Sequence, residues 1–278
     1  MQTLYRNPRD RCLRGFILVA GAIVLAALTS AITTLAHAET AEAKGLAIAV
    51  ETDKRDLGWG DAKAKLVMLL KNSQGQSAKR QMRMRLLEGK GDGDKSMIVF
   101  DWPKDIDGTA LLTWSHKSGD DDQWLFLPAL RRVKRISSSN KSGSFVGSEF
   151  SYEDLSSQEI EKYKYKWLRD EACGKQQCFV INRYPVDKRS GYTRQETWID
   201  KTEYRIQKID YYDRKNSKLK TLTFTNYKQY LGKYWRAHLL TMVNHQTGKS
   251  TALQWQEYKF RTGLRDGDFR RNALRRAR

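Results

Sequence analysis

The feature that most constrains this chain is an alternation of apolar and polar side chains with a period of two, which recurs from residue 62 onward. It is clearest at residues 81–86, where Met82, Met84 and Leu86 alternate with glutamine and arginine. Successive side chains point to opposite faces of a β-strand, so this period predicts strands. Strands are expected on this basis at residues 63–70, 81–86, 97–102, 109–116, 123–127, 163–167, 178–184, 194–200, 205–212, 219–227, 234–244 and 251–260.

Short turns separate most of these segments, as at residues 72–76, with the sequence NSQGQ. Sequential strands joined by short turns are typical of an antiparallel meander and not of a parallel sheet with crossover helices. The predicted fold class is therefore mainly β with a few helices. Helices are expected at residues 41–57 and in a short C-terminal segment that Asp266 or Asp268 would cap.

One long segment, residues 136–158, interrupts the series of strands. It is rich in Ser and Gly, and apolar side chains recur through it, among them Phe145, Phe150, Tyr152 and Leu155. Long connections in compact domains are usually functional or disordered. The regular apolar residues favour a packed loop or a lid over disorder.

The first 38 residues have the three-part layout of a secretory signal peptide. Four arginines lie within residues 1–14, residues 16–35 carry no charge, and residues 36–38 read Ala-His-Ala, a small-x-small cleavage site. This layout favours export and cleavage, with residues 39–278 as the mature chain. An uncleaved transmembrane anchor is the alternative, because the apolar run is almost long enough to span a bilayer.

The chain is strongly basic, with 51 Lys and Arg against 32 Asp and Glu and a formal net charge of +19. Such an excess is often associated with nucleic-acid binding. Export argues against a nucleic-acid partner. Four of the basic residues belong to the leader, so most of the excess stays with the mature chain.

The mature chain keeps two of the three cysteines, Cys173 and Cys178. In an oxidising compartment an isolated pair separated by four residues predicts a local disulfide at a hairpin tip. A metal site or a redox pair is less favoured. There is no nearby histidine, and redox pairs usually have two intervening residues.

Some expected strands are apolar on both faces. In residues 124–127, Trp124 and Phe126 point one way while Leu125 and Leu127 point the other. A sheet with one wet face would alternate apolar with polar residues. Two explanations remain open: a helix and a loop cover the two faces, or a curved sheet encloses a hydrophobic cavity on its concave side.

Sequence patterns of catalysis are weak. His116, His238 and His245 fall into no metal-ligand or triad spacing, and there is no nucleophile elbow. The aspartates at 92 and 94 and at 120–122 resemble fragments of calcium loops but lack the distal glutamate, so hairpin turns are expected there. The sequence therefore predicts a protein that is not an enzyme and has no metal or cofactor.

Basic residues are concentrated in two places. One is the run Arg131, Arg132, Lys134 and Arg135, and the other is the C-terminal stretch with arginines 261, 265, 270, 271, 275, 276 and 278. A solvated face that aids solubility is one interpretation. The other is attraction to an anionic partner, such as phospholipid head groups, lipopolysaccharide or an acidic face of a membrane protein.

Residues 122–139 (DQWLFLPALRRVKRISSS) and 141–155 (KSGSFVGSEFSYEDL) resemble the LolA-like outer membrane lipoprotein-sorting protein family. The resemblance extends over the mature chain, residues 39–278. It implies one domain: an unclosed antiparallel β-barrel of about eleven strands, covered by helices and loops around a hydrophobic cavity. The family pattern supplies no catalytic residue.

The resemblance implies a periplasmic carrier that binds lipid or lipoprotein acyl chains and shuttles them between an inner-membrane exporter or releasing complex and an outer-membrane acceptor. It would act as a monomer. The expected cavity residues are Met82, Met84, Leu86, Ile98, Phe100, Leu112, Trp114, Trp124 and Phe126. Phe145, Phe150, Tyr152 and Leu155 would form a lid or mouth, and Arg131, Arg132, Lys134 and Arg135 would contact an anionic head group or partner. The alternative is a periplasmic sensor or regulatory binding module on the same scaffold, which recognises a lipid or a membrane-protein segment.

Overall fold

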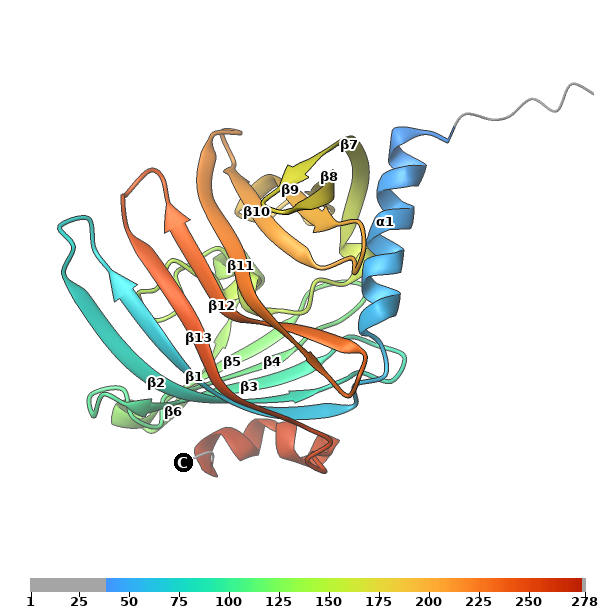
Figure 1. Cartoon of the computed structure of the whole chain (residues 1–278). Coiled ribbons are helices and arrows are strands. Elements are labelled where there is room, and N and C mark those ends of the chain that lie inside the picture. The colour runs from blue at the N-terminus through green and yellow to red at the C-terminus, as the bar shows by residue number, and fades with distance from the viewer. Residues whose placement is uncertain (1–38, 277–278) are drawn as a thin grey trace, which may run out of the picture. The chain divides into compact units, whose positions relative to one another are not determined.

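A long antiparallel sheet dominates the computed structural model, which describes residues 39–276 (Figure 1). The predicted signal peptide, residues 1–38, lies outside the described residues. Helix α1 spans Ala41–Asp56. Within the described part of the chain the strands are β1 (Asp61–Lys71), β2 (Ser77–Leu87), β3 (Lys95–Trp102), β4 (Ala110–Trp114), β5 (Asp122–Leu127), β6 (Arg132–Ile136), β7 (Tyr163–Cys173), β8 (Gln176–Pro185), β9 (Tyr192–Asp200), β10 (Ile206–Asp213), β11 (Lys218–Tyr230), β12 (Tyr234–Asn244) and β13 (Ser250–Phe260).

The sheet consists of two meanders that join through the first and last strands. Its strand order is β6-β5-β4-β3-β2-β1-β13-β12-β11-β10-β9-β8-β7, and β1 pairs with β13 in an antiparallel register that places Met68 opposite Leu253. Strands β6 and β7 are the two unpaired edges, so the barrel is unclosed. The predicted fold class is confirmed, with thirteen strands among residues 39–276 instead of about eleven. Strand β6 was not predicted, because its basic residues obscure the alternation.

The connection between β6 and β7 must cross from one edge of the sheet to the other, and it does so through the concave side. We call residues 137–162 the inner segment. Phe145, Phe150 and Tyr152 from it are buried among inward-facing strand residues such as Ile98 and Phe100. The rings of Phe145 and Phe100 lie 5.6 Å apart between centroids. Much of the concavity is thus a packed core.

A buried ion pair holds the inner segment against β11. The Lys220 ammonium lies 2.6 Å from the Asp154 carboxylate, and their side chains are only 5% and 3% exposed. Lys220 also donates to the backbone oxygen of Glu149, at 2.9 Å. The Tyr192 hydroxyl donates to Asp154 at 2.8 Å. Every strong donor and acceptor around this pair therefore has a partner, as a buried charge pair requires.

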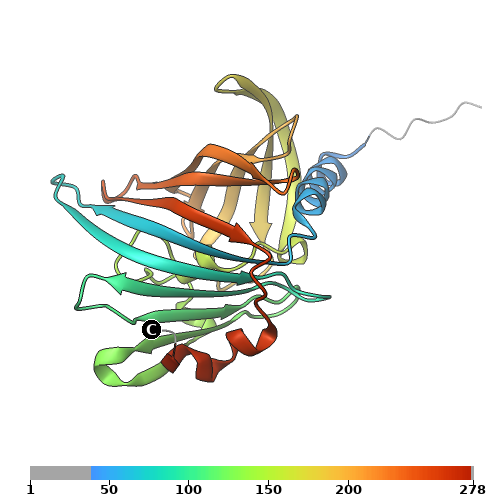
Figure 2. The same ribbon diagram turned by 60° about the horizontal axis from the view of Figure 1, so that its bottom comes forward.

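The outer face of β3–β5 is covered by the C-terminal segment, residues 266–276, which consists of two short 3₁₀ helices, Asp266–Phe269 and Arg271–Arg276 (Figure 2). Phe269 and Leu274 are buried there against strand residues that include Val99 and Leu112. The indole nitrogen of Trp114 donates to the backbone oxygen of Phe269 at 2.8 Å. The strands with two apolar faces are therefore covered on both sides.

Helix α1 begins at a threonine cap, since the Thr40 hydroxyl accepts from the backbone nitrogen of Ala43 at 3.1 Å. The helix lies against β7, where Gly45 permits close approach: a Cβ at this position would be 2.6 Å from the backbone nitrogen of Trp167. Ile48 and Ala49 are buried at this contact. The C-terminal half of α1 consequently extends over the concave side (Figure 1).

The disulfide between Cys173 and Cys178 links the end of β7 to the start of β8, with Cα atoms 5.8 Å apart. It closes the two-residue turn that joins these strands, and the Cys178 side chain is fully buried. The predicted hairpin disulfide is confirmed. It constrains the β7–β8 hairpin at one edge of the sheet.

Candidate functional site

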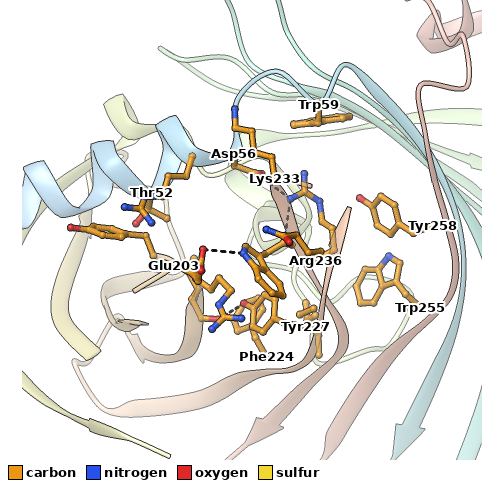
Figure 3. A pocket seen from close by; sticks show the side chains of 18 of the residues that line it. Thr52, Asp56, Trp59, Glu203, Phe224, Tyr227, Lys233, Arg236, Trp255 and Tyr258 are labelled. Carbon is orange, nitrogen blue, oxygen red and sulfur yellow. Dashed lines mark hydrogen bonds and ion pairs between the residues drawn. The ribbon is translucent and has the colours of Figure 1, made fainter. Parts of the chain in front are cut away.

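A cavity of about 710 Å³ lies on the concave side, between the C-terminal half of α1 and the inner faces of β2 and β11–β13 (Figure 3). Its volume is within the range of small-molecule binding sites. The lining residues are Thr52, Arg55, Asp56, Trp59, Met84, Leu86, Asp94, Glu203, Tyr204, Arg205, Ile206, Phe224, Tyr227, Gln229, Gly232, Lys233, Trp235, Arg236, Ala237, Leu240, Trp255 and Tyr258.

One wall of the cavity is apolar. Met84, Phe224, Leu240 and Trp255 line it and also pack against the main hydrophobic core. They belong to strands that are far apart in sequence but adjacent in the sheet, and their alternation turns them all toward the concave side. A surface of this kind, open to a cavity, can remove an apolar chain from water.

The opposite wall is polar and carries an ion pair between Asp56, the last residue of α1, and Arg236 of β12. Their side chains approach to 2.5 Å. Burial raises the pKa of Asp56, although Arg236 opposes the rise. Burial alone would lower the pKa of Arg236, but the Asp56 carboxylate raises it above its ordinary value. The pair fixes the end of α1 against β12 beside the cavity.

A second polar group lies around Trp235. The Trp235 indole nitrogen donates to Glu203 at 3.1 Å, and the Arg205 guanidinium lies 4.6 Å from the centre of the Trp235 ring. Arg205 in turn pairs with the buried Asp200 at 2.8 Å. The hydroxyl of Tyr227 donates to the backbone oxygen of Ile206. These polar groups at this end of the cavity therefore have partners within the protein, and they lie beside the apolar wall.

Asp94 lines the same cavity, and its carboxylate accepts from the backbone nitrogen of Gly89 at 2.9 Å. Burial raises its pKa to about 6, and the nearby carboxylates of Glu159, Glu88 and Asp56 add to the rise. The folded chain therefore binds a proton at Asp94 more tightly than the unfolded chain does. Between pH 4 and pH 6 this residue makes the protein less stable as the pH rises.

The Asp94→Asn variant is expected to lose this pH dependence. The amide oxygen keeps the hydrogen bond from Gly89 but carries no charge to bury, so the variant should exceed the parent in free energy of unfolding at pH 7 by at most about 3 kcal/mol. The difference should shrink toward zero at pH 4. Urea unfolding at both pH values measures it, with the exposed Asp107→Asn as the control. A difference that is equal at both pH values would contradict the assignment.

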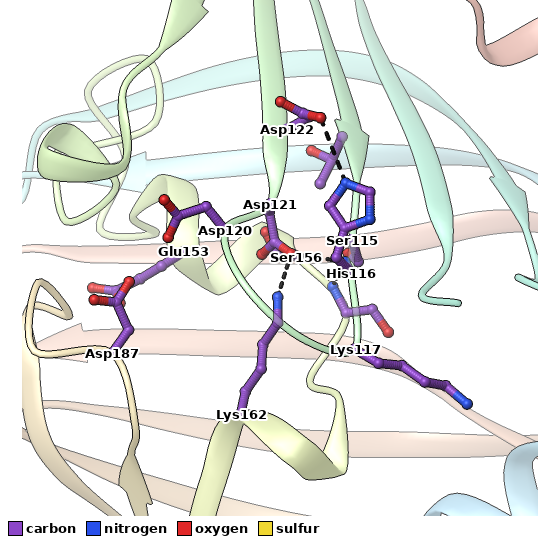
Figure 4. Close-up of polar contacts among 12 residues, drawn as sticks. Ser115, His116, Lys117, Asp120, Asp121, Asp122, Glu153, Ser156, Lys162 and Asp187 are labelled. Carbon is purple, nitrogen blue, oxygen red and sulfur yellow. Dashed lines mark hydrogen bonds and ion pairs between the residues drawn. The ribbon is translucent and has the colours of Figure 1, made fainter. Parts of the chain in front are cut away.

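A second cavity, of about 670 Å³, lies between the loops at the two edges of the sheet, and most of the residues that line it are polar or charged (Figure 4). Ion pairs cross it: Asp120 with Arg189, Asp121 with Lys162, and Asp187 with Lys141. The loop after β4 and the loop after β8 thereby make contact, although β6 and β7 do not pair. The aspartates of the calcium-like fragment at 120–122 are thus engaged with cations of the protein itself.

Metal-binding clusters and membrane-spanning helices are both absent among the described residues. Within residues 39–276, no group of three or more His, Cys, Asp or Glu side chains is arranged to hold a metal ion. In the same range, no helix has the length and apolar character needed to cross a membrane.

A family model described as "-like: Uncharacterized protein" matches residues 92–276. Among solved structures, a candidate outer membrane lipoprotein-sorting protein domain from Vibrio parahaemolyticus is 59% identical. The match covers 84% of this chain and 98% of that one, with a TM-score of 0.82. The chain belongs to the LolA-like outer membrane lipoprotein-sorting protein family.

Two further solved structures are similar to this chain. A DUF1329 family protein from Desulfovibrio piger is 30% identical over 84% of this chain and 99% of that one, with a TM-score of 0.80. A LolA superfamily protein from Nitrosomonas europaea is 19% identical, covers 82% of this chain and 98% of that one, and has a TM-score of 0.66, which shows a shared fold. No curated protein matches the chain.

Only some of the residues that the family resemblance implied as cavity lining face the cavity. Met84 and Leu86 line the 710 Å³ cavity. Met82, Ile98 and Phe100 face the concave side, but they are buried at 2%, 4% and 0% exposure beneath the inner segment. They belong to the hydrophobic core and do not line the 710 Å³ cavity.

The prediction was wrong for the other four, Leu112, Trp114, Trp124 and Phe126. They pack with Phe269 and Leu274 on the outer face, under the C-terminal segment. The strand alternation explains the error. Neighbours such as Leu111 and Leu125 point inward, so Leu112 and Trp124 must point outward. Sequence alternation separates the two faces but does not tell which face is concave.

The expected lid is also corrected. Phe145, Phe150 and Tyr152 are buried inside the concavity, at 0%, 3% and 8% exposure, and Leu155 packs against the same core. They fill part of the barrel and do not cover its mouth. The element that overlies the cavity is the C-terminal half of α1 (Figure 3).

The basic run lies far from the cavity along the sheet. Arg131 precedes β6, and Arg132, Lys134 and Arg135 belong to it, all of them exposed. β6 is an edge strand, whereas β2 and β11–β13 line the cavity, and none of these four residues does. A head group held in the cavity would therefore not reach them. Charged residues on an edge strand also discourage unwanted edge pairing.

Sequence reasoning missed most residues of the cavity wall, including Arg236, Leu240 and Trp255. One signal was available: Leu222 and Phe224 alternate with threonines, and Leu253 and Trp255 share one face of the last expected strand. Only the pairing of β1 with β13 brings these late strands next to Met84.

Proposed function

We propose that this protein is a periplasmic carrier that binds lipid or lipoprotein acyl chains in the cavity beneath α1 and shuttles them between envelope membrane complexes. The observation that carries the proposal is the cavity of about 710 Å³ with its apolar wall of Met84, Phe224, Leu240 and Trp255. Membership of the lipoprotein-sorting family supports it. An exporter or releasing complex in the inner membrane would supply the cargo, and an outer-membrane acceptor would receive it.

The binding step needs no covalent chemistry. Each methylene that leaves water for the apolar wall contributes about 0.8 kcal/mol. The polar wall formed by Asp56, Glu203, Arg205 and Arg236 keeps its hydrogen bonds and ion pairs, so the end of an acyl chain that carries polar groups can stay beside it. The proposal therefore assigns the protein a binding role and no catalytic residue.

Two measurements test the proposal. Organic extracts of protein purified after expression of the full chain should contain acyl lipids by mass spectrometry. The purified protein should also bind a fluorescent fatty acid. In the Ala237→Trp variant an indole would enter the cavity; if it excludes about four methylenes, affinity for the probe should fall by roughly 200-fold.

Val243→Trp is the matched control, because this exposed residue lies on the same strand and outside the cavity. Its affinity for the probe should equal that of the parent. Protein that carries no lipid and binds no probe would overturn the carrier proposal. Lipid binding without transfer between donor and acceptor vesicles would instead identify a sensor on the same scaffold.

A further inference from the structure

The two basic concentrations of the sequence lie side by side on the outer side of the sheet. The C-terminal segment rests on β4 and β5, and β6 is the neighbour of β5. Val133 of β6 packs against the same outer cluster that buries Leu274. The end of the C-terminal segment accordingly lies beside the turn between β5 and β6 (Figure 2). We call the exposed residues of this region the outer basic surface: Arg131, Arg135, Arg265, Arg270, Arg271, Arg275 and Arg276.

The outer basic surface is poorly neutralised by the protein itself. Among residues 39–276, Arg135 is the one arginine of the seven that forms an ion pair with a carboxylate side chain, that of Asp122. The two acidic residues of the C-terminal segment are engaged elsewhere: Asp266 pairs with Lys95 at 2.6 Å, and Asp268 accepts from the backbone nitrogen of Arg265 at 2.9 Å. Six of the seven arginines therefore have no carboxylate partner within residues 39–276 and carry positive charge toward solvent.

Basic side chains on three neighbouring strands also lie on the outer face of the sheet, in positions where they repel one another. Lys63 lies directly opposite Lys259 on one side and Arg85 on the other, so three adjacent strands carry like charges in register on the outer face. Directly opposite like charges destabilise a sheet. Glu257 contacts Lys259 at 4.0 Å but lies on the same strand and pairs more closely with Lys65, at 3.4 Å. An external anionic surface would relieve the repulsion.

An apolar side chain accompanies these charges. Leu130, in the turn between β5 and β6, is 68% exposed and directly precedes Arg131 and Arg132. An exposed leucine between cations suits the head-group region of a bilayer, where the charges meet phosphates and the apolar group reaches the acyl boundary. We propose that the outer basic surface docks this protein on an anionic phospholipid bilayer. This goes beyond the proposed function, because the cavity lies on the other side of the sheet.

Vesicle sedimentation tests the proposal, with protein purified after expression of the full chain. The protein should bind vesicles that contain phosphatidylglycerol, should bind phosphatidylcholine vesicles far more weakly, and should dissociate as salt rises. Replacing Arg270, Arg271, Arg275 and Arg276 with glutamate should lower the partition onto phosphatidylglycerol vesicles by at least about 100-fold. Phe269 and Leu274 stay in place, so the segment keeps its buried anchors.

The matched control replaces Lys175, Lys188, Lys215 and Lys228 with glutamate. These exposed lysines lie in the β7–β12 part of the chain, and the change in net charge is identical. The control should retain vesicle binding, and both variants should bind the fluorescent fatty acid like the parent, which separates this proposal from the carrier proposal. Equal loss of vesicle binding in both variants, or undiminished binding by the arginine variant, would overturn it.

Discussion

Replacing Lys220 with methionine is expected to lower the free energy of unfolding by about 3–5 kcal/mol. The reason is the carboxylate left behind. Asp154 is 3% exposed and would lose the ammonium group 2.6 Å away, so a buried charge would have no counter-ion. The backbone oxygen of Glu149 would lose its donor as well. Because Asp154 belongs to the inner segment and Lys220 to β11, the loss would weaken the attachment of that segment to the sheet.

A double variant separates the effect of charge from that of packing. Asp154→Asn removes the charge; its one amide oxygen can still accept from the backbone nitrogen of Ser151, and its amide nitrogen can donate to the Tyr192 hydroxyl. Combined with Lys220→Met, it should be more stable than Lys220→Met alone. Urea unfolding of the parent, both single variants and the double variant gives the coupling energy. If the losses of the two single variants simply add, the buried pair does not stabilise the fold as proposed.

Phe145→Ala is expected to cost about 3–5 kcal/mol of unfolding free energy. Phe145 is fully buried in the centre of the concavity, with the Phe100 ring 5.6 Å away and the Tyr152 ring 5.9 Å away between centroids. Removing the ring would forfeit these contacts and leave a void, since strands on one side and the inner segment on the other restrict collapse. The measurement is urea or thermal unfolding of the purified variant.

The control for Phe145→Ala is Val186→Ala, at a residue that is 55% exposed. Its free energy of unfolding should stay within about 0.5 kcal/mol of the parent value. Phe145 does not line the 710 Å³ cavity, so the folded fraction of the variant should bind the fluorescent fatty acid with the affinity of the parent. A stable Phe145→Ala variant with altered probe binding would instead make Phe145 the lid that its position in the sequence suggests.

Much of the local structure could be predicted from the sequence because alternation is a local property. Twelve strands, helix α1 and the Cys173–Cys178 hairpin all depend on residues that are close together along the chain. Strand β6 was not predicted. Only Val133 and Ile136 are apolar in Arg132–Ile136, and their spacing of three residues does not fit the period of two. An edge strand needs fewer apolar residues than a central one, so its pattern is weak.

The site was less predictable because it depends on which distant strands are neighbours. A single meander in sequence order would place β6 beside β7. Instead these strands are opposite edges, and the inner segment between them fills the concavity. The cavity was predicted at the early strands because of residues such as Trp124 and Phe126. In the structure it lies where β2 and β11–β13 come together. No local pattern reports which of two apolar faces is concave, or that Phe269 covers the other one.

The pairing of β1 with β13 has a consequence for how the protein is made. Met68 and its partner Leu253 are separated by most of the chain, so the middle of the sheet joins the first and the last strand of residues 39–276. Until β13 is available, β1 presents an unpaired edge and the two meanders have no shared hydrogen bonds. Such long-range pairing is slow, and the open edge invites aggregation. A C-terminal truncation that reaches β13 would therefore separate the two halves of the barrel, whereas loss of β6 or β7 would only narrow the sheet.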